Sequence, residues 1–410
     1  MTCNATGNDY DFVSCPDRCD LAVGGCIECV SNDQCSNPQP ICEATSHACR
    51  GCVRDDECPS QVCNLVTGTC TASSDVIYAA HDGVGATPCI QAQPCPLDRA
   101  IATGAVAPAT PAIIRMLPGT FELAVAVNTS KELSIIATGA TLKTSFNPGL
   151  AVGSGANLEI RGLQFELLAD SSISCGFQAT TRARLTLRQS SVTPVNGQTF
   201  VENCAFRAFD SVFNTGNLGL RDMVRFGSDA IVELDRVRLV NPTGSARDVQ
   251  GFGERMSMRI TNSVFDHVGL VFTANDPTGG ATSSQFDIGF STLVNATFDC
   301  FLPSTRRYAA RFENNILTWT SGAVVDYVRF GTACTFAQNM FFPAANQGGT
   351  NRDVDPKLVN TTLRDYQLQS SSPAIDTAVP STLFPATNDV VNVTRPQGPQ
   401  PDVGAFERKP

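Results

Sequence analysis

The sequence predicts an all-β protein: a right-handed parallel β-helix (solenoid) with a small disulfide-rich N-terminal module. Two observations predict this fold class. Short segments that alternate apolar and polar residues recur at a steady period after residue 158, and twelve cysteines fall within the first 70 residues. The 410 residues are enough for more than one domain. We expect disulfide-stapled repeats over 1–72, the β-helix with an N-terminal cap over 73–345, and a closing segment over 346–410.

The recurring segments have the pattern of strands. Their first and third positions are mostly apolar and their second position is mostly polar, which is typical of a strand and not of a helix. They are LEIRGLQF from Leu158, LTLRQSSV from Leu185, VELDRVRL from Val232, MRITNSVF from Met258, FDIGFSTL from Phe286, ARFENNIL from Ala310 and CTFAQNMF from Cys334.

The last five of these segments begin 26, 28, 24 and 24 residues apart. A strand pattern at this period favours a solenoid, in which each coil adds one strand to each face and like residues stack on like. A β-sandwich is the alternative. Two segments, from Thr199 and from Leu218, are out of phase. We expect them either on another face of the coil or in a long loop.

The cysteine-rich head contains one motif twice, CVSNDQC from Cys29 and CVRDDEC from Cys52, in a tandem repeat of about 22 residues. The repeats have the boundary cysteine Cys49 in common. Zinc is one interpretation, because Cys26/Cys29 and Cys49/Cys52 have zinc-knuckle spacing. Disulfides are the preferred one, because they account for every cysteine and replace the core that such a small module lacks. The pairing within the head cannot be read from the sequence.

The six later cysteines are expected to pair with their near neighbours, as Cys89–Cys95, Cys175–Cys204 and Cys300–Cys334. Disulfides persist in oxidising compartments, so the protein is predicted to be extracellular or on the cell surface. The first residues do not form a signal peptide, and we expect a mature form. A lipid-modified Cys3 is a minor alternative that would leave an odd number of cysteines.

The charge balance limits the partners. The chain has 29 basic and 39 acidic residues, a formal charge of −10, which argues against nucleic acid and against an anionic membrane surface. No apolar run reaches the length of a membrane span. We expect an extracellular polysaccharide or a surface protein as partner, and a monomer.

Three stretches resemble known families. Residues 15–70 loosely resemble the cysteine-rich repeats of bacterial cell-surface proteins. The stretch VIYAAHDGVGATPCIQAQPCPLDRAIATG, followed by AIIRMLPGTFEL, resembles the opening of pectin-lyase-like β-helix proteins. This resemblance implies a first strand over 76–80, a capping helix over 94–103 and a Pro-Gly-Thr turn at 118–120. The helix would cover the open end of the solenoid core.

The C-terminal stretch DPKLVN…DYQLQSSSPAIDTAV…RPQGPQPDVGAFE resembles the "choice-of-anchor Q" domain of bacterial surface β-helix proteins. In that family the segment closes the β-helix and precedes an anchor. The chain departs from the usual Asp-x-Gly at Asp376-Thr377-Ala378. The matching residues are Asp355-Pro356, Tyr366, Leu368, Ser372-Pro373-Ala374-Ile375-Asp376, Arg395-Pro396 and Asp402-Val403-Gly404-Ala405-Phe406-Glu407.

Many β-helix proteins cleave acidic polysaccharides, and their catalytic residues form recognisable patterns. Lyases resembling this fold use a Lys or Arg base, often beside Ca²⁺, and hydrolases use clustered aspartates with His-Gly and Arg-x-Lys. Neither pattern is found, and no lysine lies between Lys143 and Lys357. No cofactor is expected, with Ca²⁺ as the one ion that the resemblance allows.

The second strand position carries a polar ladder whose signs alternate from Glu233 onward. Stacked opposite charges are commonly structural. The functional interpretation is a shallow groove in which carboxylate, imidazole and guanidinium groups act as base, acid and charge clamp. The candidate catalytic residues are Asp266, His267, Asp287 and Arg311; the ladder is Glu159, Thr186, Glu233, Arg259, Asp287 and Arg311.

Exposed aromatic platforms for sugars are expected to be few, because the chain has one Trp and five Tyr, and Phe165, Phe265 and Phe312 occupy inward positions. The sequence therefore predicts a secreted or surface β-helix protein: a non-catalytic, adhesin-like or envelope-associated interaction or carbohydrate-binding scaffold. The alternative is a polysaccharide lyase or glycoside hydrolase that acts on an acidic polysaccharide.

Overall fold

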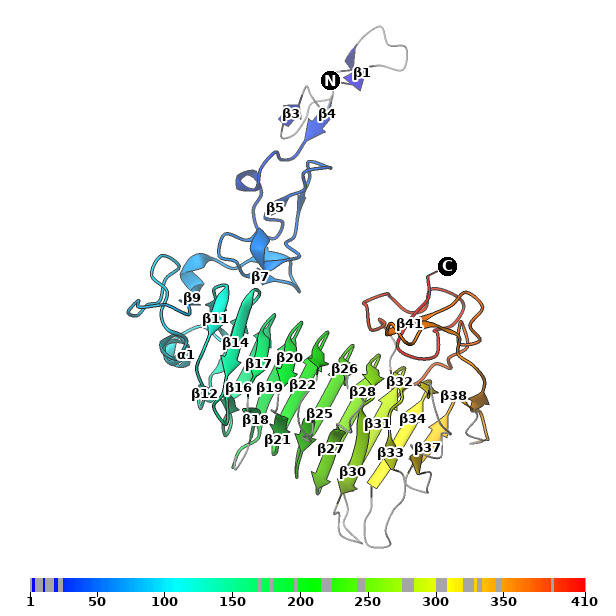
Figure 1. Ribbon diagram of the computed structural model, residues 1–410. Coiled ribbons are helices and arrows are strands. Elements are labelled where there is room, and N and C mark those ends of the chain that lie inside the picture. The colour runs from blue at the N-terminus through cyan, green and yellow to red at the C-terminus, as the bar shows by residue number, and fades with distance from the viewer. Residues whose placement is uncertain are drawn as a thin grey trace. The chain divides into compact units, whose positions relative to one another are not determined.

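In a computed structural model, the protein forms two compact units (Figure 1). The first unit comprises Met1–Gly104 and Ala112–Met116, and the second comprises Ala105–Pro111 and Leu117–Pro410. The residues that the structure describes are 2–3, 10–11, 18–20, 25–168, 171–176, 180–194, 198–214, 223–241, 248–274, 284–299, 308–319, 328–329, 334–343, 348–384 and 387–409.

The cysteine-rich head contains two modules of the same design. Each has a 3-10 turn followed by a short antiparallel strand pair. In both modules the first cysteine bonds the third and the second bonds the fourth. The cysteines of the two repeated motifs therefore form disulfide cross-links. The elements are η1 (Asn32–Gln34), β5 (Ile41–Cys42) and β6 (Cys49–Arg50), then η2 (Asp55–Glu57), β7 (Cys63–Asn64) and β8 (Thr69–Cys70). The bridges are Cys29–Cys42 and Cys35–Cys49, then Cys52–Cys63 and Cys58–Cys70.

These bridges decide between the two interpretations of the repeats. A sulfur in a disulfide is not a thiolate, so the zinc interpretation is wrong for Cys29, Cys49 and Cys52. Cys49 belongs to the first module alone, because it bonds Cys35. The side chain of Cys26 lies outside the described residues. The earliest part of the chain holds two further strand pairs, β1 (Thr2–Cys3) with β2 (Tyr10–Asp11) and β3 (Arg18–Asp20) with β4 (Gly25–Ile27).

The rest of the first unit contains the 3-10 turn η3 (Ser73–Asp75), the parallel strands β9 (Val76–Ala79) and β10 (Ala112–Met116), and the helix α1 (Leu97–Val106). The helix was expected from position 94 and begins at 97, after Pro94 and Pro96. Its buried residues fall on one stripe at helical spacing: Leu97, Ala100, Ile101 and Gly104. The expected bridge Cys89–Cys95 is present.

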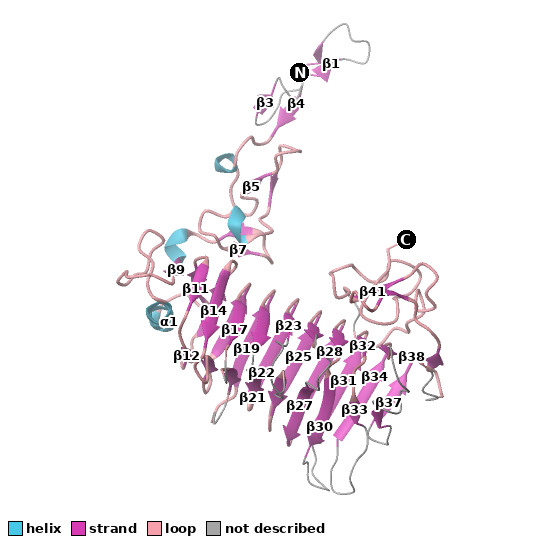
Figure 2. Cartoon of the chain, in the orientation of Figure 1, coloured by secondary structure: helices cyan, strands magenta, loops and turns pink. Residues whose placement is uncertain are grey.

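The second unit is an all-β parallel solenoid, which confirms the predicted fold class (Figure 2). Successive strands alternate among three parallel sheets, so every third strand lies in the same sheet. In this unit the first sheet contains β13 (Glu132–Ile136), β16 (Asn157–Arg161), β19 (Ala183–Arg188), β22 (Cys204–Phe209), β25 (Ile231–Asp235), β28 (Ser257–Thr261), β31 (Ser284–Gly289), β34 (Tyr308–Glu313) and β37 (Cys334–Ala337).

The two other sheets run beside the first (Figure 1). The second sheet contains β11 (Gly119–Phe121), β14 (Ala140–Thr144), β17 (Gln164–Leu167), β20 (Ser191–Pro194), β23 (Val212–Asn214), β26 (Arg238–Val240), β29 (Val264–Asp266), β32 (Thr292–Val294), β35 (Ile316–Thr318), β38 (Met340–Phe342) and β39 (Arg352–Asp353). The third contains β12 (Val125–Val127), β15 (Leu150–Val152), β18 (Ser172–Cys175), β21 (Gln198–Val201), β24 (Val224–Phe226), β27 (Asp248–Gly253), β30 (Gly269–Ala274), β33 (Phe298–Asp299) and β36 (Val328–Arg329).

The recurring segments stack in register. Leu158 pairs with Leu185, and Val232, Met258, Phe286, Ala310 and Cys334 pair in succession. The rung missing from the sequence pattern begins at Phe206, which pairs with both Leu185 and Val232. The out-of-phase Thr199 lies on the third sheet, opposite Val224. Residues 218–222 lie outside the described residues.

Phenylalanine rings fill the interior. Phe312 stacks on both Phe298 and Phe336, with ring centroids 5.0 and 4.9 Å apart, and Phe272 stacks on Phe286 at 4.0 Å. The three phenylalanines expected inside are buried: Phe165, Phe265 and Phe312. The bridge Cys175–Cys204 is present as expected. Cys334 is disulfide-bonded, and its expected partner Cys300 lies outside the described residues.

A buried polar ladder follows the turn between the first and second sheets. Ser291 N–H donates to Asn315 Oδ1 at 2.9 Å, Asn315 N–H to Asn339 Oδ1 at 2.9 Å, and Asn339 N–H to Asn351 Oδ1 at 3.1 Å. The residue before each N–H donor of the ladder has a left-handed backbone, with φ of +49° at Phe290, +57° at Asn314 and +58° at Gln338. Each side chain therefore satisfies a backbone N–H that the turn leaves out of the sheets.

Residues 355–409 pack against the solenoid. The hairpin β40 (Leu358–Asn360) and β41 (Asp365–Leu368) belongs to this segment. Gly404 N–H donates to Asn314 O, and Ala405 N–H donates to Thr292 Oγ1, both at 2.9 Å. The fully buried Arg395 donates to Asp402 O at 2.9 Å and to Gly404 O at 2.8 Å. Burial lowers the pKa of Arg395 and raises the pKa values of Asp402 and Glu407.

Candidate functional site

The polar ladder lies along the middle of the first sheet. Arg207, Glu233, Arg259, Asp287 and Arg311 pair in succession in the strand register. Arg207 is the residue that sequence analysis missed, because its strand falls in the out-of-phase window. The alternation of sign therefore begins one rung earlier than expected.

Most of these charged side chains form ion pairs with a neighbour in the ladder. Arg207 Nε lies 3.2 Å from Glu233 Oε2, and Arg311 reaches both oxygens of Asp287 at 2.7 and 2.8 Å. This bidentate contact raises the pKa of Arg311 above its usual range. The Arg259 guanidinium contacts Leu383 O in the closing segment. Asp287 is thus an ion-paired carboxylate whose lone pairs are engaged, which is a poor state for a general base.

The two other candidates form a second pair at the end of β29 on the second sheet. Asp266 is 1% exposed, and its Oδ1 accepts from Nδ1 of the half-exposed His267 at 2.5 Å. The other ring nitrogen, Nε2, accepts from Asn295 Nδ2 at 3.1 Å. This geometry fixes the orientation of the imidazole at both nitrogens.

The closing segment completes this cluster. Arg364, from the turn between β40 and β41, places Nε 2.8 Å from Asp266 Oδ2. Burial and the neighbouring Asp266 raise the pKa of Tyr366, so this phenol stays protonated as a hydrogen-bond donor. The cluster therefore holds one buried carboxylate between an imidazole, a guanidinium and a phenol. Buried carboxylates require such partners.

The four predicted residues form two separate pairs. Asp266 lies opposite Val294 in the second sheet, whereas Asp287 lies between Arg259 and Arg311 in the first. Asn295 follows His267 by 28 residues, the same step that separates Met258 from Phe286, so the coil length could have located it. Tyr366 matches the choice-of-anchor Q pattern, but no sequence signal places it or Arg364 beside Asp266, because their position depends on how the closing segment folds back.

A cavity lies two rungs beyond Asp266 along the second sheet. Asp266, Val294, Thr318 and Phe342 are in register on successive strands. The cavity has a volume of about 320 Å³ and opens between β35, β38 and the closing segment. Its lining residues are Thr318, Trp319, Phe342, Asp355, Pro356, Leu358 and Thr361.

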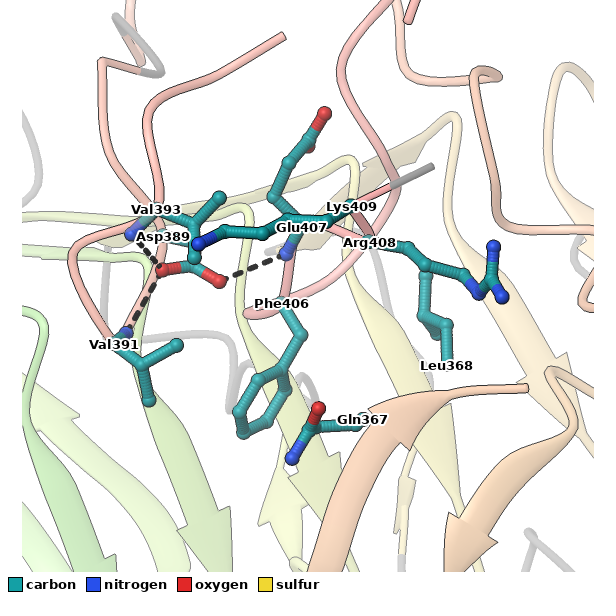
Figure 3. A pocket seen from close by; sticks show the side chains of 9 residues that line it. All are labelled: Gln367, Leu368, Asp389, Val391, Val393, Phe406, Glu407, Arg408 and Lys409. Atoms are coloured by element: carbon teal, nitrogen blue, oxygen red, sulfur yellow. Dashed lines mark hydrogen bonds between the residues drawn. The ribbon is translucent and has the colours of Figure 1, made fainter. Parts of the chain in front are cut away.

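A second cavity of about 500 Å³ lies within the closing segment (Figure 3). Asp389 faces it but accepts hydrogen bonds from the N–H groups of Val391, Val393 and Glu407 at 2.9, 2.7 and 3.0 Å. Backbone donors thus saturate this carboxylate, which gives it a structural role. The lining residues are Gln367, Leu368, Asp389, Val391, Val393, Phe406, Glu407, Arg408 and Lys409.

Within the part of the chain that the structure describes, only cysteines converge in threes closely enough to hold a metal ion, and these are in disulfides. No residue set is therefore assigned to Ca²⁺. Among the same residues, no helix has the length and apolarity needed to cross a membrane.

Comparison with known proteins finds a similar fold in a solved structure. No family model matches the chain, and no curated protein matches it. The fold is similar to that in the crystal structure of pectate lyase Pel9A. The two chains are 14% identical over 82% of this chain and 96% of that one, with a TM-score of 0.43.

Proposed function

We propose that this protein is an extracellular or cell-surface interaction scaffold, adhesin-like or envelope-associated, that binds a polysaccharide or a surface protein as a monomer. The observation that carries the proposal is the ion-paired ladder on the first sheet. Arg311 occupies both oxygens of Asp287, and Arg207 contacts Glu233. An array of mutually neutralised charges is suited to a stable surface and poorly suited to proton transfer.

Two further features support the extracellular assignment. The described residues include six complete disulfides, which persist in oxidising compartments. Arg395, Asp402 and Glu407, which match the choice-of-anchor Q pattern, form the buried polar centre of the closing segment. We further propose that the chain has three parts, 1–72, 73–345 and 346–410, and that the last part closes the solenoid.

The test is an activity and binding assay on the whole chain. The protein is incubated with uronate-containing and neutral polysaccharides, with and without Ca²⁺, and unsaturated ends and new reducing ends are measured. We expect binding without turnover, unchanged in Asp287→Ala and Arg311→Ala. Turnover that either substitution abolishes would overturn the scaffold proposal and make the ladder a catalytic groove.

A second candidate function, a polysaccharide lyase or glycoside hydrolase, is favoured by the Asp266–His267 pair. A buried carboxylate that orients a half-exposed imidazole is an arrangement used in acid–base catalysis. One observation argues against this second function. Asn295 already donates to His267 Nε2, the nitrogen that would have to accept a proton. Turnover lost in His267→Gln and kept in Asp287→Asn would assign catalysis to this pair.

A further inference from the structure

We propose that the cavity beside β35 and β38 is a binding site for a single neutral pyranose ring at the end of a glycan. This inference rests on the scaffold function proposed above, and it names the ligand class and the place. The site is formed by the outer ends of two solenoid strands and by the start of the closing segment.

An exposed aromatic ring forms one wall. Phe342 is 39% exposed, whereas most described phenylalanines of the solenoid are buried in its core. Among the described residues, Phe146 is the other exposed phenylalanine, and it lines none of the cavities described above. An apolar ring held open at the rim of a cavity can stack on the apolar face of a sugar.

Trp319 gives this wall a fixed shape. Its indole is 2% exposed, and Nε1 donates to Ala296 O at 2.9 Å. Its backbone N–H donates to Phe342 O, also at 2.9 Å. The indole and the backbone of Phe342 are therefore held in neighbouring rungs, so little backbone conformational entropy is lost there when a ligand binds.

The opposite wall is polar. Asp355 is exposed, and its Oδ1 accepts from Lys357 N–H at 2.8 Å, which orients the carboxylate. Within the described residues, Asp355 Oδ2 has no hydrogen-bond donor and is available to accept from a sugar hydroxyl. Thr318 and Thr361 add hydroxyl groups that both donate and accept.

The charge of the lining selects a neutral ring. Asp355 is the only charged residue among the residues that line the cavity, so a uronate would meet an unbalanced carboxylate. The nearest described guanidinium in the neighbouring cluster, Arg364, is ion-paired with Asp266. A quaternary ammonium ligand is disfavoured, because it requires several exposed aromatic faces and the cavity offers Phe342 alone.

The size and position select a terminal ring. About 320 Å³ is at the low end of small-ligand sites, which span roughly 300–1,000 Å³. Two rungs separate Thr318 from Asp266, a distance of roughly 10 Å at the usual strand spacing. The ring can therefore bind without contacting His267, and a His267 variant serves as a control for the neighbouring cluster.

The experiment measures binding of the full chain to methyl glycosides of neutral hexoses and to galacturonate by titration calorimetry. Phe342→Ala and Asp355→Asn are compared with Val359→Ala, an exposed residue of strand β40 that does not line the cavity. We expect a neutral glycoside to bind, and binding to weaken about tenfold in Phe342→Ala and Asp355→Asn, since a stack or a charged hydrogen bond contributes about 1.4 kcal/mol. Val359→Ala and His267→Gln should bind as the unmodified chain does.

Two outcomes would overturn the site. One is that no neutral glycoside binds; the other is that one binds equally well in both cavity variants. Retained binding of a polysaccharide or surface protein in either case would leave the scaffold function standing, whereas loss of all binding by the unmodified chain would remove both. Because Phe342 and Asp355 are exposed, the variants are expected to fold, and an unchanged thermal transition checks this.

Discussion

The cysteine-rich modules and the solenoid are ordered by opposite means. In the modules the buried cluster consists of Ile41 and three cysteines, Cys52, Cys58 and Cys63, so cross-links replace a core. In the solenoid, rows of apolar residues and stacked phenylalanine rings continue from coil to coil. The difference teaches that short repeats need covalent constraint when each must fold by itself. Repeats that stack stabilise one another, because each coil buries the face of the next.

The polar contacts of the head and of the solenoid also differ: those of the head are local in the sequence, whereas those of the solenoid join successive coils. In the head, Arg50 of the first module reaches Glu43 of the same module at 2.5 Å and Glu57 of the second module at 2.8 Å, contacts that are local in the sequence. In the solenoid, polar contacts join residues one coil apart, as between Asp287 and Arg311 or between Asn315 and Asn339. These solenoid contacts join residues 24 apart in the sequence, whereas these head contacts join residues 7 apart.

The largest expected effect is the loss of a stacked ring in the solenoid. Phe312→Ala removes a buried ring that stacks on two others and should lower the free energy of unfolding of the solenoid by about 4 kcal/mol. Urea denaturation followed by circular dichroism measures it, with the exposed Phe342→Ala as control. An equal effect of the two substitutions would contradict the stacked-core description.

The next largest effect is expected from the loss of a disulfide in the cysteine-rich head. Replacing Cys52 and Cys63 together by serine should cost the second module about 3 kcal/mol, because the bridge closes a short loop that has little other core. Limited proteolysis with mass spectrometry should then find cleavage within 50–72 and none within 130–340. Equal cleavage of the two regions would refute the comparison.

A smaller effect is expected from the buried polar ladder. Asn315→Ala leaves the N–H of Ser291 and the carbonyl of Ile288 without their partners, and should cost roughly 2 kcal/mol. Asn315→Ser is the matched control, because serines occupy the same ladder position at 263 and 291 and accept from the preceding rung. The serine variant should lose less stability, and the reverse order would argue against the ladder.

An acid-dependent effect is expected in the head. Hydrogen bonds from Arg50 hold the pKa of Glu57 at about 2, below its unfolded value of about 4.3. A depressed folded pKa gives stability that is present above the unfolded value and is lost as the pH falls from about 4.3 toward 2. In Glu57→Gln this part of the acid dependence should disappear, as proteolysis of the module between pH 5 and pH 2.5 would measure. An unchanged pH profile would contradict the assignment.

The smallest effect is expected from the surface ladder. A double-mutant cycle with Asp287→Ala and Arg311→Ala should give a coupling energy of about 0.5–1 kcal/mol that decreases with added salt, because the pair is partly exposed. Thermal unfolding at low and high ionic strength measures it. A coupling of several kcal/mol would mean that the pair has a role beyond the rung-to-rung contact.

The sequence by itself determined the stacking of the solenoid and the use of disulfides. In a parallel stack each residue lies on its equivalent in the next coil, so Val232, Met258, Phe286, Ala310 and Cys334 could be aligned from their spacing alone. Near-neighbour pairing likewise located Cys89–Cys95 and Cys175–Cys204.

Only the tertiary structure decided the crossed pairing within each head module, the rung at Phe206, and the contacts of the closing segment. Many connectivities fit one set of cysteines, and a rung whose loops change length loses its phase in the sequence. Arg364 meets Asp266 across nearly 100 residues because the chain folds back over the second sheet. The same return brings Asp355 and Thr361 beside Phe342. Periodicity specifies neighbours one coil apart, whereas a segment that folds back is positioned by packing that no local pattern encodes.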